Sequence, residues 1–217
     1  MATAAGGDMR YAIIGPGNVG SAIARAVTDA GHEAVVAGPS EEDLRTLAGN
    51  VPVATTTSNV DAVSGADVVV LAVPFAAVND VVTGLRDELA GKIVLDATNP
   101  LAPDMSGLMT DGTSGAELVA EAAPEARVVK AFNTVFAGNQ ATATVDGTQL
   151  DGFVASDDSG AKQTIMDLLA AIGFRPIDVG GLSVARYLEG MGFINIALNA
   201  RNDWSWQSAW KLVGPLS

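Results

Sequence analysis

The stretch Ile13-Ile14-Gly15-Pro16-Gly17-Asn18-Val19-Gly20, or IIGPGNVG, decides the fold. It places the spacing G-x-G-x-x-G directly between an apolar run, YAIIG, and a segment with helical periodicity, which is the context that a dinucleotide-binding loop requires. In such a loop Gly15 permits the tight turn, Gly17 lets a pyrophosphate approach, and Gly20 lets the helix pack on the strand. The phosphates would lie at the helix N-terminus. A glycine-rich turn without a ligand is the alternative interpretation.

Short apolar runs alternate with helix-period segments from Arg10 to about Asp178, and the runs are apolar on successive residues, as in strands covered on both faces. The predicted strands are YAIIG, EAVVAG, a weaker VPVAT, DVVVLAVP, KIVLDATNP, RVVKAFNT, DGFVAS and FRPIDV. The predicted helices are Ser21–Ala30, Glu41–Ala48, Ala76–Ala90, Ala116–Ala122 and Ala161–Ala171. The alternation predicts an α/β fold, a Rossmann-type, doubly wound, mostly parallel sheet with a short C-terminal helical segment.

The length of 217 residues, 48% of them hydrophobic, suits one domain with an appendage. Residues 9–180 are predicted to form the dinucleotide-binding domain. Residues 181–217 are predicted to form a tail, helical through Ala197, whose tryptophans serve packing or dimerisation first and a stacking wall for a flavin second. The long Gly- and Asp-rich loop Leu101–Ser114 is either a lid or a mobile surface insertion.

The charge balance limits the partners. Twelve basic against 25 acidic residues give a net charge of -13, which disfavours nucleic acid and anionic membranes. The absence of cysteine excludes disulfides and thiolate chemistry, and no metal site is predicted. The N-terminal MATAAGGD lacks the basic and apolar regions of a signal peptide, and no apolar run approaches the roughly 20 residues that span a bilayer. We therefore expect a cytoplasmic protein.

The end of the second strand governs which dinucleotide is bound. An acid about 20 residues beyond the glycine motif would bind the ribose 2'-hydroxyl of NAD, but HEAVVAGPSEED offers none at Ala37-Gly38-Pro39-Ser40. Ser40 is predicted to cap the next helix, whose first turn carries three acids. The same hydroxyl could also donate to the 2'-phosphate of NADP, and Arg45, one turn into the helix, could approach that phosphate.

Unusual residues gather at the other strand ends, where ligands of open α/β sheets lie. Asn99 and Asn133 are candidates to bind the nicotinamide ribose or carboxamide, with turn capping as the alternative. Lys130 is predicted to snorkel or to pair with Asp96 rather than to act in catalysis. His32, the single histidine, falls at the opposite edge of the sheet, so no catalytic general base is predicted. Hydride transfer between two redox cofactors needs little acid-base help.

The series GPGNVG, HEAVVAG, DVVVLAVP, GKIVLDATNP, VVKAFNTV and GFRPIDVGGL resembles the NADPH-dependent F420 reductases, the F420H2:NADP oxidoreductases, over nearly the whole chain. The same order is similar to the oxidoreductase domain of the six-transmembrane prostate-antigen metalloreductases. The resemblance implies that Gly15, Gly17, Asn18 and Val19 hold the pyrophosphate. It also implies that Ala72, Val73, Pro74 and Phe75 flank the adenosine and ribose, and that Asn99, Pro100, Phe132 and Asn133 surround the nicotinamide. The family usually has a Ser-Arg pair where this chain has Pro39-Ser40.

These observations favour an oxidoreductase that transfers hydride between NADP(H) and F420, FMN or FAD. A homodimer is expected, with small-molecule redox cofactors as the partners. Two alternatives stay open. One is an NADPH-dependent reductase of a small carbonyl or imine, although such enzymes need a large helical second domain. The other is a non-catalytic NADP(H)-binding sensor or redox-partner protein, which the fold alone does not exclude.

Overall fold

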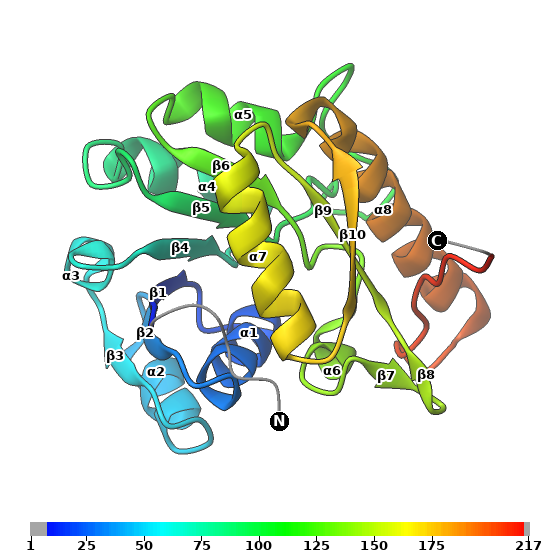
Figure 1. The fold of residues 1–217 in the computed structure, drawn as a ribbon, viewed down its shortest axis with the longest axis horizontal. Coiled ribbons are helices and arrows are strands. Elements are labelled where there is room, and N and C mark those ends of the chain that lie inside the picture. Colours follow the sequence, from blue (N-terminus) through cyan, green and yellow to red (C-terminus); the bar gives the residue numbers. More distant parts are fainter. Residues whose placement is uncertain (1–7, 215–217) are drawn as a thin grey trace.

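The computed structural model describes residues 8–214 and is built on one eight-stranded sheet, in the order β10-β9-β6-β5-β4-β1-β2-β3 (Figure 1). Its strands are β1 (Arg10–Ile14), β2 (Glu33–Ala37), β3 (Ala54–Thr56), β4 (Val68–Leu71), β5 (Ile93–Asp96), β6 (Arg127–Lys130), β9 (Asp151–Ala155) and β10 (Arg175–Gly180). The pairs from β3 to β6 are parallel, whereas β9 meets β6 antiparallel and runs parallel to β10. The predicted mostly parallel, Rossmann-type sheet is confirmed.

Helices cover both faces of the sheet. They are α1 (Asn18–Asp29), α2 (Glu41–Ala48), α3 (Asn59–Val63), α4 (Phe75–Gly84), α5 (Gly115–Ala122), α6 (Ala137–Gln140), α7 (Ser159–Ala171) and α8 (Ala185–Asn202), with a short 3-10 turn at Leu182–Val184. Buried residues of α1, α2 and α7 form one core with Tyr11 and Ile13 of β1, while those of α3, α4, α5 and α8 form a second with Ala12 and Ile14. Successive β1 residues thus point to opposite faces, both buried.

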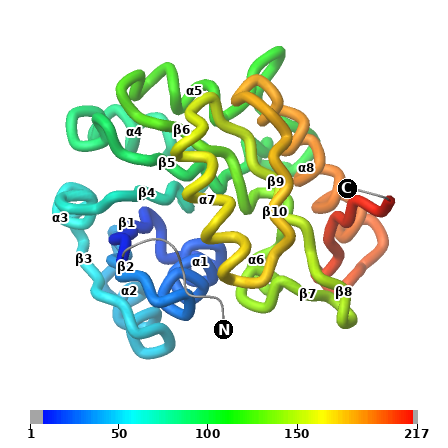
Figure 2. Tube along the Cα trace, viewed as in Figure 1, coloured from blue at the N-terminus to red at the C-terminus, as the bar shows by residue number. Residues whose placement is uncertain are grey.

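The chain reverses its direction of travel across the sheet between β1 and β4. From β1 it moves outward to β2 and β3, then returns to place β4 on the other side of β1, as the tube in Figure 2 shows. At such a switch point the connections on either side turn away from each other and leave a crevice beyond the carboxyl ends of the strands. The glycine loop Gly15–Gly17, which follows β1, therefore borders that crevice.

Several element boundaries were predicted wrongly, among them that of the helix predicted over Ser21–Ala30, which begins three residues earlier, at Asn18. The helix predicted over Ala76–Ala90 ends at Gly84, where the N–H of Leu85 is shared between the carbonyls of Val81 and Val82. Leu85 and Leu89 are buried, so their spacing of four imitates a helix although the chain there makes turns. The weak strand VPVAT is displaced to Ala54–Thr56, an edge strand for which apolar alternation gives little signal.

Short elements were missed altogether. They are α3, α6 and the hairpin of β7 (Thr144–Val145) and β8 (Thr148–Gln149), none of which is long enough to show a period. The last helix continues past the predicted Ala197 to Asn202 and ends at Asp203, which has a left-handed φ of 54°. That conformation is common where helices end.

The segment after α8 turns back along the molecule and is fixed at the outer edge of the sheet (Figure 1). Asp151 of β9 accepts hydrogen bonds from Arg175, from Lys211 at 2.9 Å and from the backbone N–H of Leu212 at 2.7 Å. The separate status of residues 181–217 stays a prediction, and residues 1–7 and 215–217 lie outside the described part. Within residues 8–214 no helix combines the length and apolar character needed to cross a bilayer.

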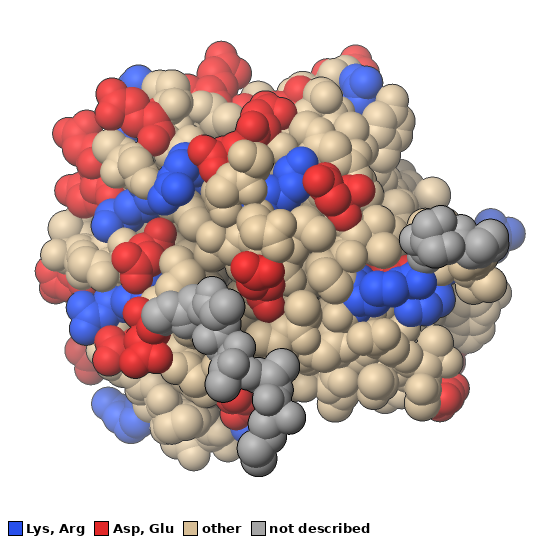
Figure 3. All heavy atoms as spheres, viewed as in Figure 1, with Lys and Arg blue, Asp and Glu red and all other residues tan. Residues whose placement is uncertain are grey.

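Acidic side chains are unevenly spread. In the view of Figure 3, which is that of Figure 1, they gather over the left side of the molecule, where α2, α3 and α4 lie. Between residues 181 and 214 the acids are Glu189, which is buried, and Asp203, against Arg186, Arg201 and Lys211. The C-terminal segment is therefore a non-acidic part of a chain whose net charge is -13.

Candidate functional site

The glycine loop has the geometry that its sequence predicts. Gly15 has a φ of +118°, which side chains rarely adopt, and a Cβ there would lie 2.5 Å from the carbonyl oxygen of Ala72. At Gly20 a Cβ would lie 1.8 Å from the carbonyl oxygen of Gly15, so helix α1 packs directly on the loop. The tight turn and the close helix contact are thus requirements of the protein backbone itself.

The N-terminus of α1 faces open space, whereas Gly15 and Gly20 are packed tightly against the protein backbone. Gly17 is its N-cap, no side chain caps it, and its first turn carries no acid. A Cβ at Gly17 would meet nothing within 4 Å, and a groove of about 660 Å³ lies beside it, lined in part by Asn18, Ser21 and Arg25. Backbone N–H groups of an uncapped first turn that face open space suit a pyrophosphate.

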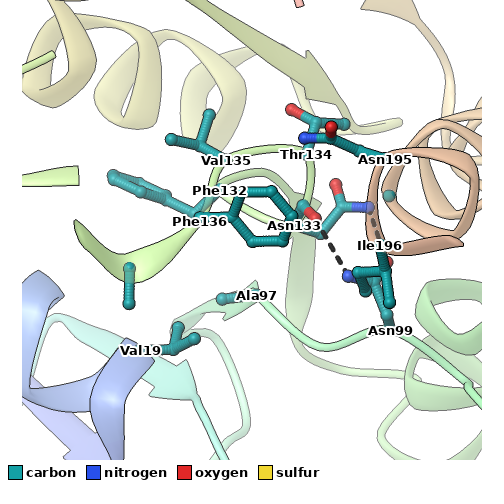
Figure 4. Close-up of a pocket in the computed structure, with 12 residues that line it drawn as sticks. Val19, Ala97, Asn99, Phe132, Asn133, Thr134, Val135, Phe136, Asn195 and Ile196 are labelled. Carbon is teal, nitrogen blue, oxygen red and sulfur yellow. Dashed lines mark hydrogen bonds between the residues drawn. The ribbon is translucent and has the colours of Figure 1, made fainter. Parts of the chain in front are cut away.

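A cavity of about 120 Å³ lies where α1, the ends of β5 and β6, and α8 converge (Figure 4). Its lining residues are Val19, Ala97, Asn99, Phe132, Asn133, Thr134, Val135, Phe136, Ala137, Gly192, Asn195 and Ile196. Four of the predicted site residues, from three separate segments, are therefore brought together here: Val19, Asn99, Phe132 and Asn133. None of the described residues in this lining has an ionisable side chain.

The two predicted asparagines bind each other. Asn133 Nδ2 donates to Asn99 Oδ1 at 2.9 Å, and Asn99 Nδ2 donates to the carbonyl of Asn133 (Figure 4). Asn133 Nδ2 also donates to the carbonyl of Leu188 in α8. The alternative that they cap turns is therefore wrong, because their side chains join β5, β6 and α8. Asn133 Oδ1 is buried without a partner among the described residues. An unpaired buried acceptor beside a cavity suits a ligand that donates a hydrogen bond.

Phe132 is held in a strained conformation. It is buried and has a φ of +66°, and its ring meets Phe174 edge to face at a centroid distance of 6.3 Å. Behind it, Gln140 Nε2 donates to the carbonyl of Val135 at 3.1 Å and fixes the turn that follows β6. A left-handed bulky residue costs of order 1–3 kcal/mol and persists only where the surroundings enforce it, as often occurs at ligand sites.

The sequence analysis did not predict the part of the cavity lining that comes from α8, which consists of Gly192, Asn195 and Ile196. Gly192 lies against the asparagine pair, and a Cβ there would be 2.7 Å from Asn99 Oδ1. Asn195 and Ile196 follow one turn later on the same side of α8. The glycines in Gly190-Met191-Gly192, within a helical pattern, were the available signal, since mid-helix glycines often mark a close approach.

Lys130 pairs with Asp96, as predicted, and also with the carboxylate of Glu189, a pairing that was not predicted. Its Nζ lies 2.8 Å from Asp96 Oδ2, 2.8 Å from Glu189 Oε1 and 2.7 Å from the carbonyl of Thr98, and all three ionisable side chains are fully buried. Burial opposes the charged form, but the two carboxylates more than offset it and hold the pKa of Lys130 above its ordinary value. Burial raises the pKa of Glu189. The triad of Lys130, Asp96 and Glu189 therefore links α8 to the ends of β5 and β6, and Thr98, whose carbonyl Lys130 also binds, directly precedes Asn99.

The residues predicted to read the 2'-phosphate lie apart from this cavity. Ser40 caps α2, as predicted, by accepting the N–H of Asp43 at 3.2 Å. Arg45 is exposed and lines neither the cavity nor the groove, and its role stays a prediction. Arg25, which was missed, does line the groove and donates to the carbonyl of Asn50 at 2.7 Å. Its place on α1, opposite α2, could not be inferred from the local pattern.

The remaining candidates lie around these features. Ala72 and Val73 are half-buried beside Gly15, and Pro74 precedes the first turn of α4. Pro100 is buried, and its carbonyl accepts the N–H of Met109 across the loop that follows β5. His32 lies at the amino end of β2, where its Nδ1 accepts the N–H of Met9, far from the cavity as predicted. The contact of each residue with a cofactor stays a prediction.

Comparison with known proteins identifies relatives of this arrangement. Residues 10–100 match the family model described as NADP oxidoreductase coenzyme F420-dependent. The F420-dependent NADP reductase of Methanothermobacter thermautotrophicus is 32% identical over 212 residues, which cover 89% of this chain and 90% of the relative. The metalloreductase STEAP3 of Rattus norvegicus is 33% identical over 182 residues, 84% of this chain, but the match spans only 36% of that longer protein.

A solved structure extends the likeness to the whole fold. A crystal structure from Arthrobacter sp. FB24, which carries the provisional description F420-dependent NADP-reductase, superposes with a TM-score of 0.87 at 27% identity. The superposition covers 95% of this chain and all of the other, so the C-terminal helix is included. Together with the methanogen reductase, which aligns over nine tenths of its length, these findings show that the chain belongs to the F420-dependent NADP reductase family of NADP oxidoreductases.

Proposed function

We propose that the protein transfers hydride between NADP(H) and a deazaflavin such as F420 or a flavin. The observation that carries the proposal is the cavity at the strand ends, which lies beside an open helix N-terminus and is lined by described residues without an ionisable side chain. When bound, NADPH supplies the hydride from its nicotinamide ring. The residues of the chain bind and orient the rings and exclude water between them.

The binding of the dinucleotide is supported from both ends of the site. The uncapped first turn of α1 would take the pyrophosphate at Gly17, Asn18 and Val19. Val19 also lines the cavity, so a molecule that leaves the helix N-terminus on this side meets Asn99 and Asn133 directly. The unpartnered Asn133 Oδ1 would accept an N–H from the carboxamide of the nicotinamide.

The uncharged lining favours a cofactor over a carbonyl as the second substrate. Reduction of a carbonyl creates an alkoxide that a positioned acid must protonate, and the residues that do this are most often His, Asp, Glu, Lys or Tyr. The triad of Lys130, Asp96 and Glu189 lies nearby but is fully buried and internally bonded. Transfer to a deazaflavin or flavin places the electrons in a conjugated ring, which takes up its proton from solvent.

The preference for NADP over NAD rests on Ser40 and Arg45. The Ser40 hydroxyl accepts one hydrogen bond, which leaves its hydrogen free to donate to a 2'-phosphate. The guanidinium of Arg45 makes no hydrogen bond or ion pair within residues 8–214, so it is available to a phosphate that lies over α2. The acids in the first turn of α2 oppose this, so the expected preference is moderate.

A homodimer is also proposed, formed along α8. This helix buries Ala185, Leu188 and Gly192 beside the polar Glu189, Asn195 and Asn199, whereas Tyr187, Ile194 and Leu198 are 60%, 48% and 38% exposed. Apolar side chains that are exposed along one helix favour burial against a second surface. Cytoplasmic location and the absence of nucleic-acid and membrane partners stay predictions.

The test is steady-state absorbance with NADPH or NADH and each of F420, FMN and FAD. We expect NADPH oxidation with at least one acceptor. For Arg45→Ala we expect the NADPH preference to fall by about tenfold, the loss of one charge-assisted hydrogen bond. Arg201→Ala serves as the control, because Arg201 is exposed at the end of α8 and lines neither the cavity nor the groove; it should leave the NADPH preference unchanged.

No oxidation of either nucleotide with any of the three acceptors would contradict the proposed reaction. If NADPH bound without acceptor-dependent oxidation and a protein partner co-purified, the sensor alternative would take its place. If the wild-type protein used NADH and NADPH equally well, the proposed hydride transfer would still be supported, but the proposed preference for NADP over NAD would be contradicted.

A further inference from the structure

Trp206 occupies an unusual position for an exposed tryptophan. Its backbone has a left-handed φ of +59°, and 44% of the residue is open to solvent. Its ring meets that of Phe136 edge to face, with centroids 5.5 Å apart. Phe136 in turn lines the cavity at the strand ends. The Phe136–Trp206 pair therefore carries an aromatic surface from the cavity lining to the outside of the molecule.

A network of asparagines holds the segment that carries Trp206. Asn199 Oδ1 accepts the N–H of Trp206 at 3.1 Å, and Asn199 Nδ2 donates to Ser208 Oγ at 2.6 Å. Asn195 Oδ1 accepts from the same Ser208 hydroxyl, and Asn139 of α6 donates to the carbonyl of Gln207. Asn195, Asn199 and Asn139 are buried.

This network is specific to one conformation of the chain. Asn139, Asn195 and Asn199 each make a hydrogen bond to residues 206–208 that exists only when this segment follows its observed path, although Asn199 Nδ2 also donates to the carbonyl of Asn195 within α8. A buried amide that loses its partner costs about 1–3 kcal/mol. A polar, fully bonded support beneath an exposed ring in a strained backbone is the kind of arrangement that ligand sites show. Packing alone does not account for it, because nearly half of Trp206 remains in water.

The size of the cavity leaves a second ring outside it. Pockets that enclose a drug-sized ligand measure about 300–1,000 Å³, and this cavity measures about 120 Å³. It is suited to one ring, such as the nicotinamide of the proposed function. A tricyclic ring that receives hydride from that nicotinamide has to stack over the opening, where its outer part needs an apolar surface.

We propose that Trp206, together with Phe136, is the wall against which the planar tricyclic ring of the second redox cofactor packs. The ring is an isoalloxazine or its 5-deaza analogue, since both present the same flat, conjugated faces and edges. The inference rests on the proposed function and assigns the substrate side of the same site. Trp206 acts in binding and orientation and exchanges no proton or electron.

The experiment is an equilibrium titration of FMN, FAD and F420, each followed by its own fluorescence, at saturating NADP+ so that no turnover occurs. For Trp206→Ala we expect the Kd of the bound ring to rise about 3- to 10-fold, as the loss of one aromatic contact predicts. Trp206→Phe should recover most of the affinity. The Kd of NADP+ should stay unchanged in both variants.

Trp204→Ala is the matched control, because Trp204 is 47% exposed, lies two residues away and makes no ring contact with Phe136. It should leave every Kd unchanged. If Trp206→Ala binds the ring as tightly as wild type, or if Trp204→Ala weakens binding equally, the inference is overturned while the proposed reaction stands. If the wild-type protein binds none of the three rings, the inference and the proposed function are both overturned.

Discussion

The two halves of the candidate site are built by different means. On the α1 side, the constraints are backbone contacts at glycines: the local one of Gly20 with Gly15, and that of Gly15 with Ala72, which follows the neighbouring strand β4. On the α8 side, the constraints are side-chain hydrogen bonds over long distances in sequence: Asn133 to Leu188 spans 55 residues, Asn139 to Gln207 spans 68, and Lys211 to Asp151 spans 60. The first half depends on glycines, which have no side chain, whereas the second half depends on specific polar side chains.

The difference teaches why one half can be recognised from sequence and the other cannot. A glycine that must lie close to backbone five residues away is a local rule, and it gives a fixed spacing. An asparagine buried under a distant tail has the same appearance in sequence as an asparagine in a surface turn. The following predictions test whether the two halves respond to substitution as this contrast requires.

The largest effect is expected at Lys130, which joins the end of β5 to α8 through Asp96 and Glu189. Lys130→Met leaves two buried carboxylates face to face, and breaking a buried ion pair in this way costs about 3–5 kcal/mol of unfolding free energy. Urea unfolding measures it. Lys130→Met combined with Glu189→Gln should recover part of the loss; equal stability of the single and double variants would show that the carboxylates do not repel.

The next effects are expected at Gly20 and Gly17, where substitution by alanine should distinguish a loss of stability from a loss of NADPH binding. Gly20→Ala places a Cβ inside contact distance of the Gly15 carbonyl, so α1 must shift. We expect a loss of about 1–3 kcal/mol in unfolding free energy. NADPH affinity should also fall more than about tenfold, through the displaced N–H groups.

Gly17→Ala is the matched variant, since its Cβ meets no protein atom within 4 Å. It should keep wild-type stability and still weaken NADPH, because the added methyl lies where the pyrophosphate approaches. Thermal unfolding and NADPH fluorescence measure the two quantities. Unchanged NADPH affinity in Gly17→Ala would remove the pyrophosphate from this loop.

The smallest effect is expected at the clamp of the tail on β9. Burial alone would raise the pKa of Asp151, but its hydrogen bonds from Arg175, Leu212 and Lys211 outweigh burial and hold that pKa below its ordinary value. The stability from a lowered pKa is present above the unfolded value of about 4 and is lost as pH falls through the folded value. Asp151→Asn should cost about 1–2 kcal/mol at pH 7.

The same variant should differ less from wild type as the pH falls below about 4, because the carboxyl of the unfolded wild-type chain then takes up a proton before that of the folded chain does. Chemical unfolding at pH 7 and pH 3 checks this. A difference that stayed constant between the two values would show that charge at Asp151 does not hold the tail.

The predictions from sequence succeeded where structure depends on near neighbours. The order of strands and helices, the glycine loop and the Ser40 cap all follow from such patterns and are confirmed. The pairing of Lys130 with Asp96, 34 residues away, is confirmed as well, because both residues end strands of one parallel sheet. The helix predicted through Ala90 failed because Leu85 and Leu89 are buried from turns at a spacing of four. The alternative that Asn99 and Asn133 cap turns is excluded because their side chains bond to each other's segments and to Leu188, while their contact with a cofactor stays a prediction.

By itself, the sequence determined the doubly wound sheet and the backbone requirements of the glycine loop, because apolar periodicity and glycine spacing act within one supersecondary unit. Only the tertiary structure decided that Val19, Asn99, Phe132 and α8 enclose one cavity without charge, and that Trp206 lies beside it. Those neighbours come from segments more than 30 residues apart. Their meeting depends on how the sheet, α8 and the tail pack, and this packing leaves no period in the sequence.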